Sequence, residues 1–279
     1  MMPRRISEWW VVAVAFCVLV FLCGAAWAAI DFDGLDDVLD CGSASSLDDI
    51  SPLTYSTWVN IDTSGEGSFG RFFDKTTIRF LINQNSANQL TFGHVTTGTA
   101  LDRSTTANPV AFDSWHHVLF TWNGGLLWSG VHIYIDGTEA LYAGGTDGTG
   151  SLSSDAADNL LLGNRAAGDR TFDGMFADTA MWAAVLSADE ISRLALSRRT
   201  QIPLQIRPAD LRLYVSITEF SDGVTASGTG AIRDRSGNGN HCTPTNSPVG
   251  RAQPLGIQGV AWLRSPITVP WALAARVVW

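Results

Sequence analysis

Charged residues are scarce in this chain of 279 residues, at 16%, and Lys75 is its only lysine. The formal net charge is -9 at pH 7. Because such an acidic balance repels a phosphate backbone, it argues against nucleic-acid binding. Apolar residues make up 46% of the chain, which is enough to bury a core and excludes an intrinsically disordered chain. We expect a folded protein without a nucleic-acid partner.

Several motifs of catalytic and metal chemistry are also missing. The sequence contains no nucleophile elbow, no G-x-x-x-x-G-K phosphate loop and no CxxC pair that would indicate zinc. His116 and His117 are adjacent, so in a strand they point to opposite faces and do not share a metal ion. Acyl transfer, nucleotide binding and zinc binding are therefore disfavoured.

The chain begins with the features of a secretory signal peptide. Arg4 and Arg5 precede an apolar run that starts at Trp9, and Ala26-Trp27-Ala28 offers an A-x-A cleavage site. An uncleaved membrane anchor is the alternative, because the run approaches the ~20 apolar residues of a spanning helix. We favour the interpretation that residues 1–28 are a signal peptide, which predicts a secreted or cell-surface protein. An uncleaved leader would be its only contact with a membrane.

Removal of that leader takes Cys17 and Cys23 with it and leaves Cys41 and Cys242. In an oxidising compartment these two can form one disulfide, which would close a loop of about 200 residues and add on the order of 4 to 5 kcal/mol. Two buried free thiols are the alternative.

After the leader, short strands alternate with turns, the pattern of an antiparallel sandwich. In the segment 54–61, TYSTWVNI, the alternation places Trp58 on the face opposite its apolar neighbours. Asn123-Gly124 and Asp136-Gly137 tolerate the positive φ of tight hairpin turns. One short helix is expected near 187–198, because the Ser-Ala-Asp-Glu string that opens it is a capping box followed by an apolar stripe.

Motifs in a fixed order identify a family. They are FDGLDDVLDCG at 32–42, WHHVLFTWNG at 115–124, VHIYIDGTEA at 131–140 and VLSADEI at 185–191. Over 30–197 this series resembles the laminin-G-like branch of the concanavalin A-like lectin/glucanase superfamily. The resemblance implies an all-β fold, a two-sheet antiparallel jelly roll, and most often a binding or adhesion module.

The segment 211–258 is out of the family's usual order. LRLYVSITEF followed by IRDRSGNGNHCTPTNSP is similar to the stretch that normally precedes the FDG motif, yet here it closes the chain. We interpret residues 29–258 as one permuted jelly roll that this segment completes. Its residues 211–248 are expected to pair with the sheet of the FDG strand, which would bring Cys41 close to Cys242. A truncated second domain is the alternative, although too few residues follow for another core.

The tail 259–279 is apolar and rich in tryptophan, but two arginines and two prolines argue against a membrane span. We expect an extended segment or an interface.

The resemblance also frames the chemistry. The glucanase branch carries an E-x-D-x-x-E pair of carboxylates, as glycoside hydrolysis requires, and this sequence has no such string. We therefore expect no enzyme. Calcium is the one cofactor that the resemblance favours, with Asp178 of FADTAMW as the matching ligand and Asp33 as a second. Thr179 stands where the family more often has an acidic residue, and solvated turn aspartates are the alternative interpretation.

Sugar recognition commonly uses aromatic rings beside polar groups. The candidates are Trp58, Trp122, Trp128 and Tyr134, of which Trp128 lies in the loop GGLLWSG, whereas core packing is the competing role for each. We expect a secreted, non-catalytic module that binds a glycan or a cell-surface or extracellular protein. A structural component of an extracellular or particle-associated assembly is the alternative, and a glycosidase with an unusual Asp pair is least favoured.

Overall fold

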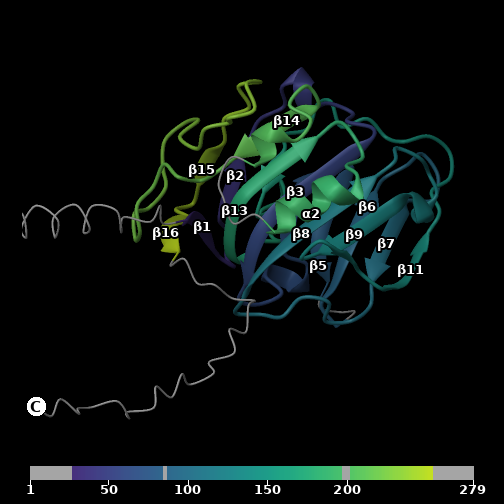
Figure 1. The fold of residues 1–279 in the computed structure, drawn as a ribbon, viewed down its shortest axis with the longest axis horizontal. Helices are drawn as coiled ribbons and strands as arrows, with labels where there is room; N and C mark the ends of the chain where they lie inside the picture. Colours follow the sequence, from purple (N-terminus) through teal and green to yellow (C-terminus); the bar gives the residue numbers. More distant parts are fainter. Residues whose placement is uncertain (1–26, 84–86, 197–201, 254–279) are drawn as a thin grey trace, which may run out of the picture.

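The computed structural model describes residues 27–83, 87–196 and 202–253, which form two antiparallel sheets and one α-helix (Figure 1). Sheet A contains β1 (Trp27–Asp33), β3 (Leu53–Ile61), β8 (Trp115–Trp122), β9 (Val131–Ile135), β10 (Thr138–Glu139), β13 (Asp173–Trp182), β14 (Leu211–Val215) and β16 (Val249–Gln253). Sheet B contains β2 (Val38–Asp40), β4 (Arg71–Lys75), β5 (Ile78–Asn83), β6 (Gln89–His94), β7 (Leu101–Thr105), β11 (Tyr142–Thr146), β12 (Leu161–Leu162) and β15 (Thr243–Thr245). The all-β, two-sheet jelly roll expected from the sequence is confirmed.

The strand order is that of a sandwich whose sheets mix early and late segments. Sheet A runs β10-β9-β8-β3-β13-β1-β16, with β14 also paired to β13, and sheet B runs β11-β7-β6-β5-β4-β12-β2-β15. The hairpin between β9 and β10 turns at Asp136 and Gly137, whose φ values of 51° and 80° are those that Asp-Gly tolerates. This predicted turn is therefore confirmed.

The core between the sheets is built from aromatic and branched side chains on alternating strand positions. In β3, Tyr55, Val59 and Ile61 are fully buried in this core, while Trp58 lies on the other face, as the alternation predicts. The Tyr55 and Phe120 rings are stacked with centroids 6.0 Å apart. Each such side chain contributes roughly 1.5–3 kcal/mol through burial, so the interface between the sheets supplies the main stabilisation.

The helix α2 (Ala188–Leu196) covers part of the outer face of sheet A. It begins with the predicted capping box, because the Ser187 N–H donates to Glu190 Oε2 at 2.8 Å and the Glu190 N–H donates to Ser187 Oγ at 3.4 Å. Ile191 and Leu194 then pack against Leu119 and Trp182 in one cluster. Residues 197 and 198, which the prediction included, lie outside the described part of the chain.

The C-terminal segment completes both sheets. β14 pairs with the second half of β13, β16 pairs with β1, and β15 pairs with β2 in sheet B. The expectation that residues 211–248 join the sheet of the FDG strand holds for β14, whereas β15 pairs in the other sheet. β16, which also joins the sheet of the FDG strand, follows the stretch for which that pairing was expected. Residues 254–258 of the predicted domain lie outside the described residues.

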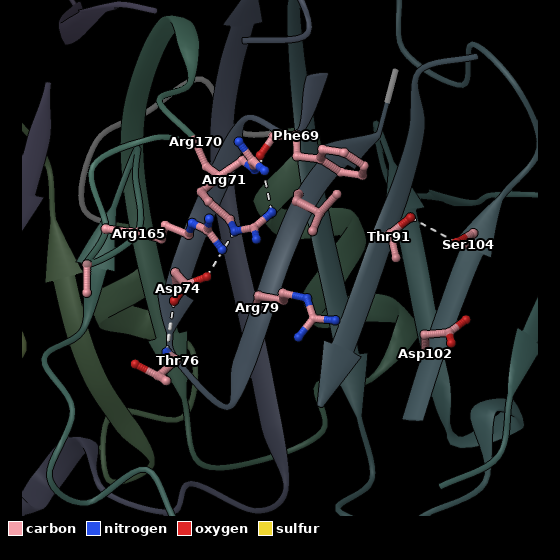
Figure 2. Close-up of a pocket in the computed structure, with 13 residues that line it drawn as sticks. Phe69, Arg71, Asp74, Thr76, Arg79, Thr91, Asp102, Ser104, Arg165 and Arg170 are labelled. Atoms are coloured by element: carbon pink, nitrogen blue, oxygen red, sulfur yellow. Dashed lines mark hydrogen bonds and ion pairs between the residues drawn. The ribbon is translucent and has the colours of Figure 1, made fainter. Parts of the chain in front are cut away.

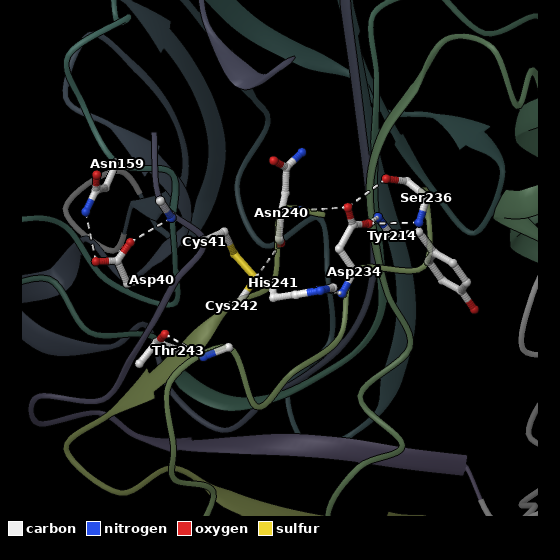
Figure 3. The surroundings of a disulfide bond; sticks show 12 residues. Asp40, Cys41, Asn159, Tyr214, Asp234, Ser236, Asn240, His241, Cys242 and Thr243 are labelled. Atoms are coloured by element: carbon white, nitrogen blue, oxygen red, sulfur yellow. Dashed lines mark hydrogen bonds between the residues drawn. A yellow bond between two sulfur atoms is a disulfide. The ribbon is translucent and has the colours of Figure 1, made fainter. Parts of the chain in front are cut away.

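A disulfide lies where β15 joins sheet B beside β2. Cys41, directly after β2, is bonded to Cys242, directly before β15, with Cα atoms 3.9 Å apart (Figure 3). Both residues are buried. The predicted bond is confirmed, and it joins positions 201 residues apart in the sequence.

Asp234 organises the loop that leads to Cys242 (Figure 3). Its carboxylate accepts hydrogen bonds from the N–H groups of Tyr214, Ser236 and Asn240 at 2.9–3.0 Å. The glycines of SGNGN in this loop, Gly237 and Gly239, have φ values of 95° and 79°. This glycine-rich stretch is therefore a structural turn.

The predicted leader 1–28 and the tail 259–279 lie almost wholly outside the described residues. The exceptions are Trp27 and Ala28, which pair in β1 with Gln253 and Ala252 of β16. Within the described ranges, no helix has both the length and the apolar character needed to cross a membrane.

Candidate functional site

The outer face of sheet B carries a surface pocket of about 720 Å³ (Figure 2). The corresponding face of sheet A is partly covered by α2 and its flanking segments. The pocket floor comes from β4, β5, β6 and β7, and one wall comes from the loop 165–170. A ligand can therefore reach this face of the sandwich.

The register places the outward side chains of the floor in two rows. The first row is Asp74, Arg79, Gly93 and Asp102 on successive strands. The second row is Arg71, Leu81, Thr91 and Ser104. Phenylalanines at the intervening positions, Phe73, Phe80 and Phe92, point into the core instead, because strand side chains alternate between faces. The same alternation that builds the core therefore builds the pocket.

Most cations of the pocket already have partners within the protein. Arg71 Nε donates to Asp74 Oδ2 at 2.9 Å, and burial lowers the pKa of the Arg71 guanidinium, although Asp74 opposes this. Arg165 donates to both carboxylate oxygens of Asp169, at 2.6 and 2.8 Å. Arg170 donates to the backbone oxygen of Asp169 at 2.6 Å. These contacts hold the wall loop and the edge of the floor in place.

Arg79 differs from the other arginines of the pocket. Among the described residues, its guanidinium forms no hydrogen bond or ion pair, and it lies over Gly93 of the neighbouring strand. A Cβ at Gly93 would stand 3.2 Å from Arg79 Cζ, so the missing side chain leaves the space that the guanidinium occupies. Arg79 is thus a half-buried cation whose donors face the pocket.

The pocket also offers an aromatic ring and hydroxyl groups. Phe69 is half-buried at the rim, with the Arg170 guanidinium carbon 5.5 Å from its ring centroid. Thr91 Oγ1 and Ser104 Oγ lie 2.8 Å apart on the floor. A ring, two hydroxyls and a free cation are the groups that recognise a polar ligand with apolar faces.

A second pocket, of about 560 Å³, continues from the first and shares Asp74, Thr76, Arg165 and Ala166 with it. Its lining adds carboxylates rather than cations, from Asp36, Asp40 and Asp158. The outer face of sheet B therefore carries an extended depression that is basic at the Arg79 end and acidic at the other.

None of the aromatic residues predicted from the sequence lines this pocket. Trp122 is 1% exposed in the core between the sheets, and its Nε1 donates to the Gly125 oxygen at 2.8 Å. Trp58 is 6% exposed and packs with Ala29 and Ala177. The rings of these two residues are packed within the fold, and ligand binding by them stays a prediction.

Trp128 and Tyr134 are half-buried, and each packs in different surroundings. Arg103 lies between the rings of Trp128 and Tyr142, with its guanidinium carbon 4.8 and 3.3 Å from the two centroids. Tyr134 packs against the cluster of α2. The predicted aromatic residues therefore form no common platform. The feature that would have indicated the pocket is Arg79, which points outward beside a glycine on the next strand.

The proposed calcium ligands do not meet. Asp33 faces Asp173 in the pairing of β1 with β13, whereas Asp178 lies farther along β13, about 16 Å away at ~3.3 Å per residue. Asp178 is buried at a bulge, where Tyr214 Oη donates to its Oδ1 at 2.8 Å. The pairing of Asp33 with Asp178 was wrong for this geometric reason.

Asp33 instead lies with Asp36 and Asp37, whose carboxylate oxygens are within 4.8 Å of one another. Asp37 is 2% exposed, and its Oδ1 has no hydrogen-bond partner in the described structure. Burial, together with Asp33, Asp36 and Asp31, raises the pKa of Asp37 to about 7, against the hydrogen bond from the Asp33 N–H. The donor set is of the hard-oxygen kind that calcium prefers.

Calcium remains a prediction, and this group gives it a test. If an ion binds here, the melting temperature should rise with calcium concentration as RT ln(1 + [Ca²⁺]/Kd), because the ion relieves the repulsion among the carboxylates. Differential scanning calorimetry across millimolar calcium measures the rise, and Asp37→Asn should reduce it while Asp178→Asn should not. Identical melting curves in calcium and in chelator would rule the ion out.

The family model Laminin_G_3, described as the concanavalin A-like lectin/glucanases superfamily, matches residues 33–192, more than half of the chain. The chain belongs to this family. The match spans β2 to the start of α2 and ends before β14, so the C-terminal strands that complete the two sheets lie outside it. No curated protein matches the sequence.

Several solved structures align with this chain at low sequence identity. A Bacteroides ovatus ATCC 8483 protein assigned as carbohydrate-binding aligns with a TM-score of 0.58 and 17% identity, covering 82% of this chain and 60% of that protein. The chain thus spans about three fifths of that protein's length. A heptameric SAP-like pentraxin from Limulus polyphemus has a TM-score of 0.40 and 15% identity, covering 62% of this chain and 84% of its own. Domains LG4-5 of the mouse laminin alpha1 chain align with a TM-score of 0.41 and 14% identity, covering 58% of this chain and 43% of that chain.

Proposed function

We propose that this protein is a secreted, non-catalytic module that binds a glycan in the pocket on the outer face of sheet B. The observation that carries the proposal is the pocket itself, where the Phe69 ring, the hydroxyls of Thr91 and Ser104 and the free guanidinium of Arg79 face one hollow. Sugars present apolar ring faces and hydroxyl edges, and these groups match both. The Bacteroides ovatus protein of the same fold is assigned to carbohydrate binding, which supports the ligand class.

The carboxylates of the pocket favour binding of the glycan without its hydrolysis. Glycoside hydrolysis normally requires two carboxyl groups on either side of the scissile bond. In the pocket, Asp74 already accepts from Arg71 Nε and from the Thr76 N–H at 2.8 Å, so its oxygens are used by the scaffold. Asp102 is left as the one pocket carboxylate on the floor without a side-chain partner among the described residues.

Secretion is supported by two independent features. The leader has the pattern of a signal peptide, and the Cys41–Cys242 disulfide is of the kind that persists in oxidising compartments.

Replacing Phe69 with alanine should weaken glycan binding about tenfold, equivalent to about 1.4 kcal/mol, because the substitution removes the stacking surface at the rim. A glycan array identifies a ligand, and isothermal titration calorimetry then measures the change. Val224→Ala, at an exposed position of the C-terminal segment, is the control and should leave affinity unchanged. Equal binding by both variants would contradict the site, and new reducing ends released from any bound polysaccharide would contradict the absence of catalysis.

A further inference from the structure

We propose that the glycan carries carboxylate groups, as in a polysaccharide that contains uronic acid, and that Arg79 binds the carboxylate. This inference rests on the proposed function and names the class of ligand for the same pocket. The arginines of the pocket differ in their partners. Arg71, Arg165 and Arg170 donate to Asp74 or to Asp169, whereas Arg79 has no such partner in the described residues. A half-buried guanidinium without a protein partner keeps its N–H donors available for an anion from outside.

The position of Arg79 suits a planar anion. Its side chain lies over Gly93 and points along the floor toward Thr91 and Asp102 (Figure 2). A guanidinium presents parallel donors that match the two oxygens of a carboxylate. Thr91 and Ser104, in the next row of the floor, can contact the hydroxyls of the same sugar ring.

The charges around Arg79 select a weakly charged ligand over a strongly charged one. Arg71 and Asp74 neutralise each other, and Arg165 and Arg170 share the single carboxylate of Asp169. Asp102 is in the same row as Arg79, and Asp36, Asp40 and Asp158 line the adjoining pocket. A densely sulfated chain would meet these carboxylates and be repelled, whereas one carboxylate per sugar can be placed at the Arg79 end. Asp102 can then accept from sugar hydroxyls.

The test compares acidic polymers with their own neutral forms. Polygalacturonate, alginate and hyaluronan are each titrated into the protein at physiological salt beside the carboxyl-reduced polymer of the same backbone, with heparin as the sulfated comparison. We expect at least one acidic polymer to bind tenfold or more tightly than its reduced form and more tightly than heparin. Arg79→Gln should lower the affinity for that polymer to the level of the reduced form.

Two further variants separate the role of Arg79 from general charge and from folding. Arg193→Gln, on the exposed face of α2 at the opposite side of the sandwich, removes the same charge and should leave binding unchanged. Gly93→Ala should weaken binding of the acidic polymer but not of its carboxyl-reduced form, because the added Cβ of the alanine displaces the flexible end of Arg79. Unchanged melting temperatures confirm that these variants are folded.

The outcomes distinguish this inference from the proposed function. If neutral and acidic forms bind equally and Phe69→Ala weakens both, the glycan site stands and the acidic ligand is overturned. Tighter binding of heparin than of every unsulfated uronate polymer also overturns it. If no polysaccharide binds, the proposed function fails and the inference fails with it.

Discussion

Replacing Cys41 and Cys242 together with alanine should lower the free energy of unfolding by about 4 kcal/mol. The bond closes a loop between positions 201 residues apart, so its loss restores a large amount of conformational freedom to the unfolded chain. It also removes the covalent link beside the pairing of β15 with β2, since the bonded cysteines adjoin these two strands. Urea denaturation at neutral pH measures the loss as a shift in the midpoint.

Reduction provides the control for this prediction. A reductant should destabilise the wild-type protein by a similar amount and should have no effect on the double-alanine variant. If the variant unfolds at the midpoint of the oxidised wild type, the bond does not hold the C-terminal strands, and their pairing alone would have to account for the fold.

The parts of the fold that the sequence predicts well are those determined by local chemistry. The capping box at Ser187 and Glu190 is satisfied within four residues of chain, and the Asp136-Gly137 turn is set by the φ angles that these residues tolerate. The alternation in β3 places Tyr55 in the core for a similar reason, since the period of a strand is fixed. None of these features depends on distant partners.

The pocket was missed because it depends on lateral register. Arg79, Gly93 and Asp102 become neighbours only through the pairing of β5, β6 and β7, which no short window of sequence contains. The roles of the aromatic residues are also hard to assign from the sequence. In a chain with eleven tryptophans, Trp122 and Trp58 are needed for the core and for the outer face of sheet A, and ring chemistry alone does not tell these roles apart.

Asp178 shows how a residue chosen for one role can have another. It lies at the bulge of β13 with φ of 46°, where β1 gives way to β14 as the neighbouring strand. Burial raises the pKa of Asp178 to about 6, against the hydrogen bond from Tyr214 and the attraction of Arg235. A carboxylate buried with a single hydroxyl donor destabilises the native state whenever it is ionised.

The stability of the protein should therefore depend on the ionisation of Asp178. The native pKa lies above the value of 3.8 for an unperturbed aspartate, so the native state binds the proton more tightly than the unfolded chain does. The contribution of this group is fully present below that lower value and is lost as pH rises through about 6. His117, which burial beside Ser56 leaves with a pKa of about 4, acts in the opposite sense, because its stabilising effect is lost as pH falls.

Asp178→Asn should remove this dependence and make the protein relatively more stable at high pH. Asparagine keeps the Oδ1 acceptor for Tyr214 and tolerates the positive φ, but it carries no charge to bury. The difference in unfolding free energy between variant and wild type should grow in favour of the variant by about 2 kcal/mol between about pH 4 and about pH 8. Urea denaturation of both proteins across this range measures the difference, and subtracting the values for the wild type removes the effect of His117.

The control is Asp189→Asn on the exposed surface of α2, which should give a much smaller change with pH. A constant difference for Asp178→Asn would mean that Asp178 is ionised at no cost in the folded protein, as it would be beside a bound cation.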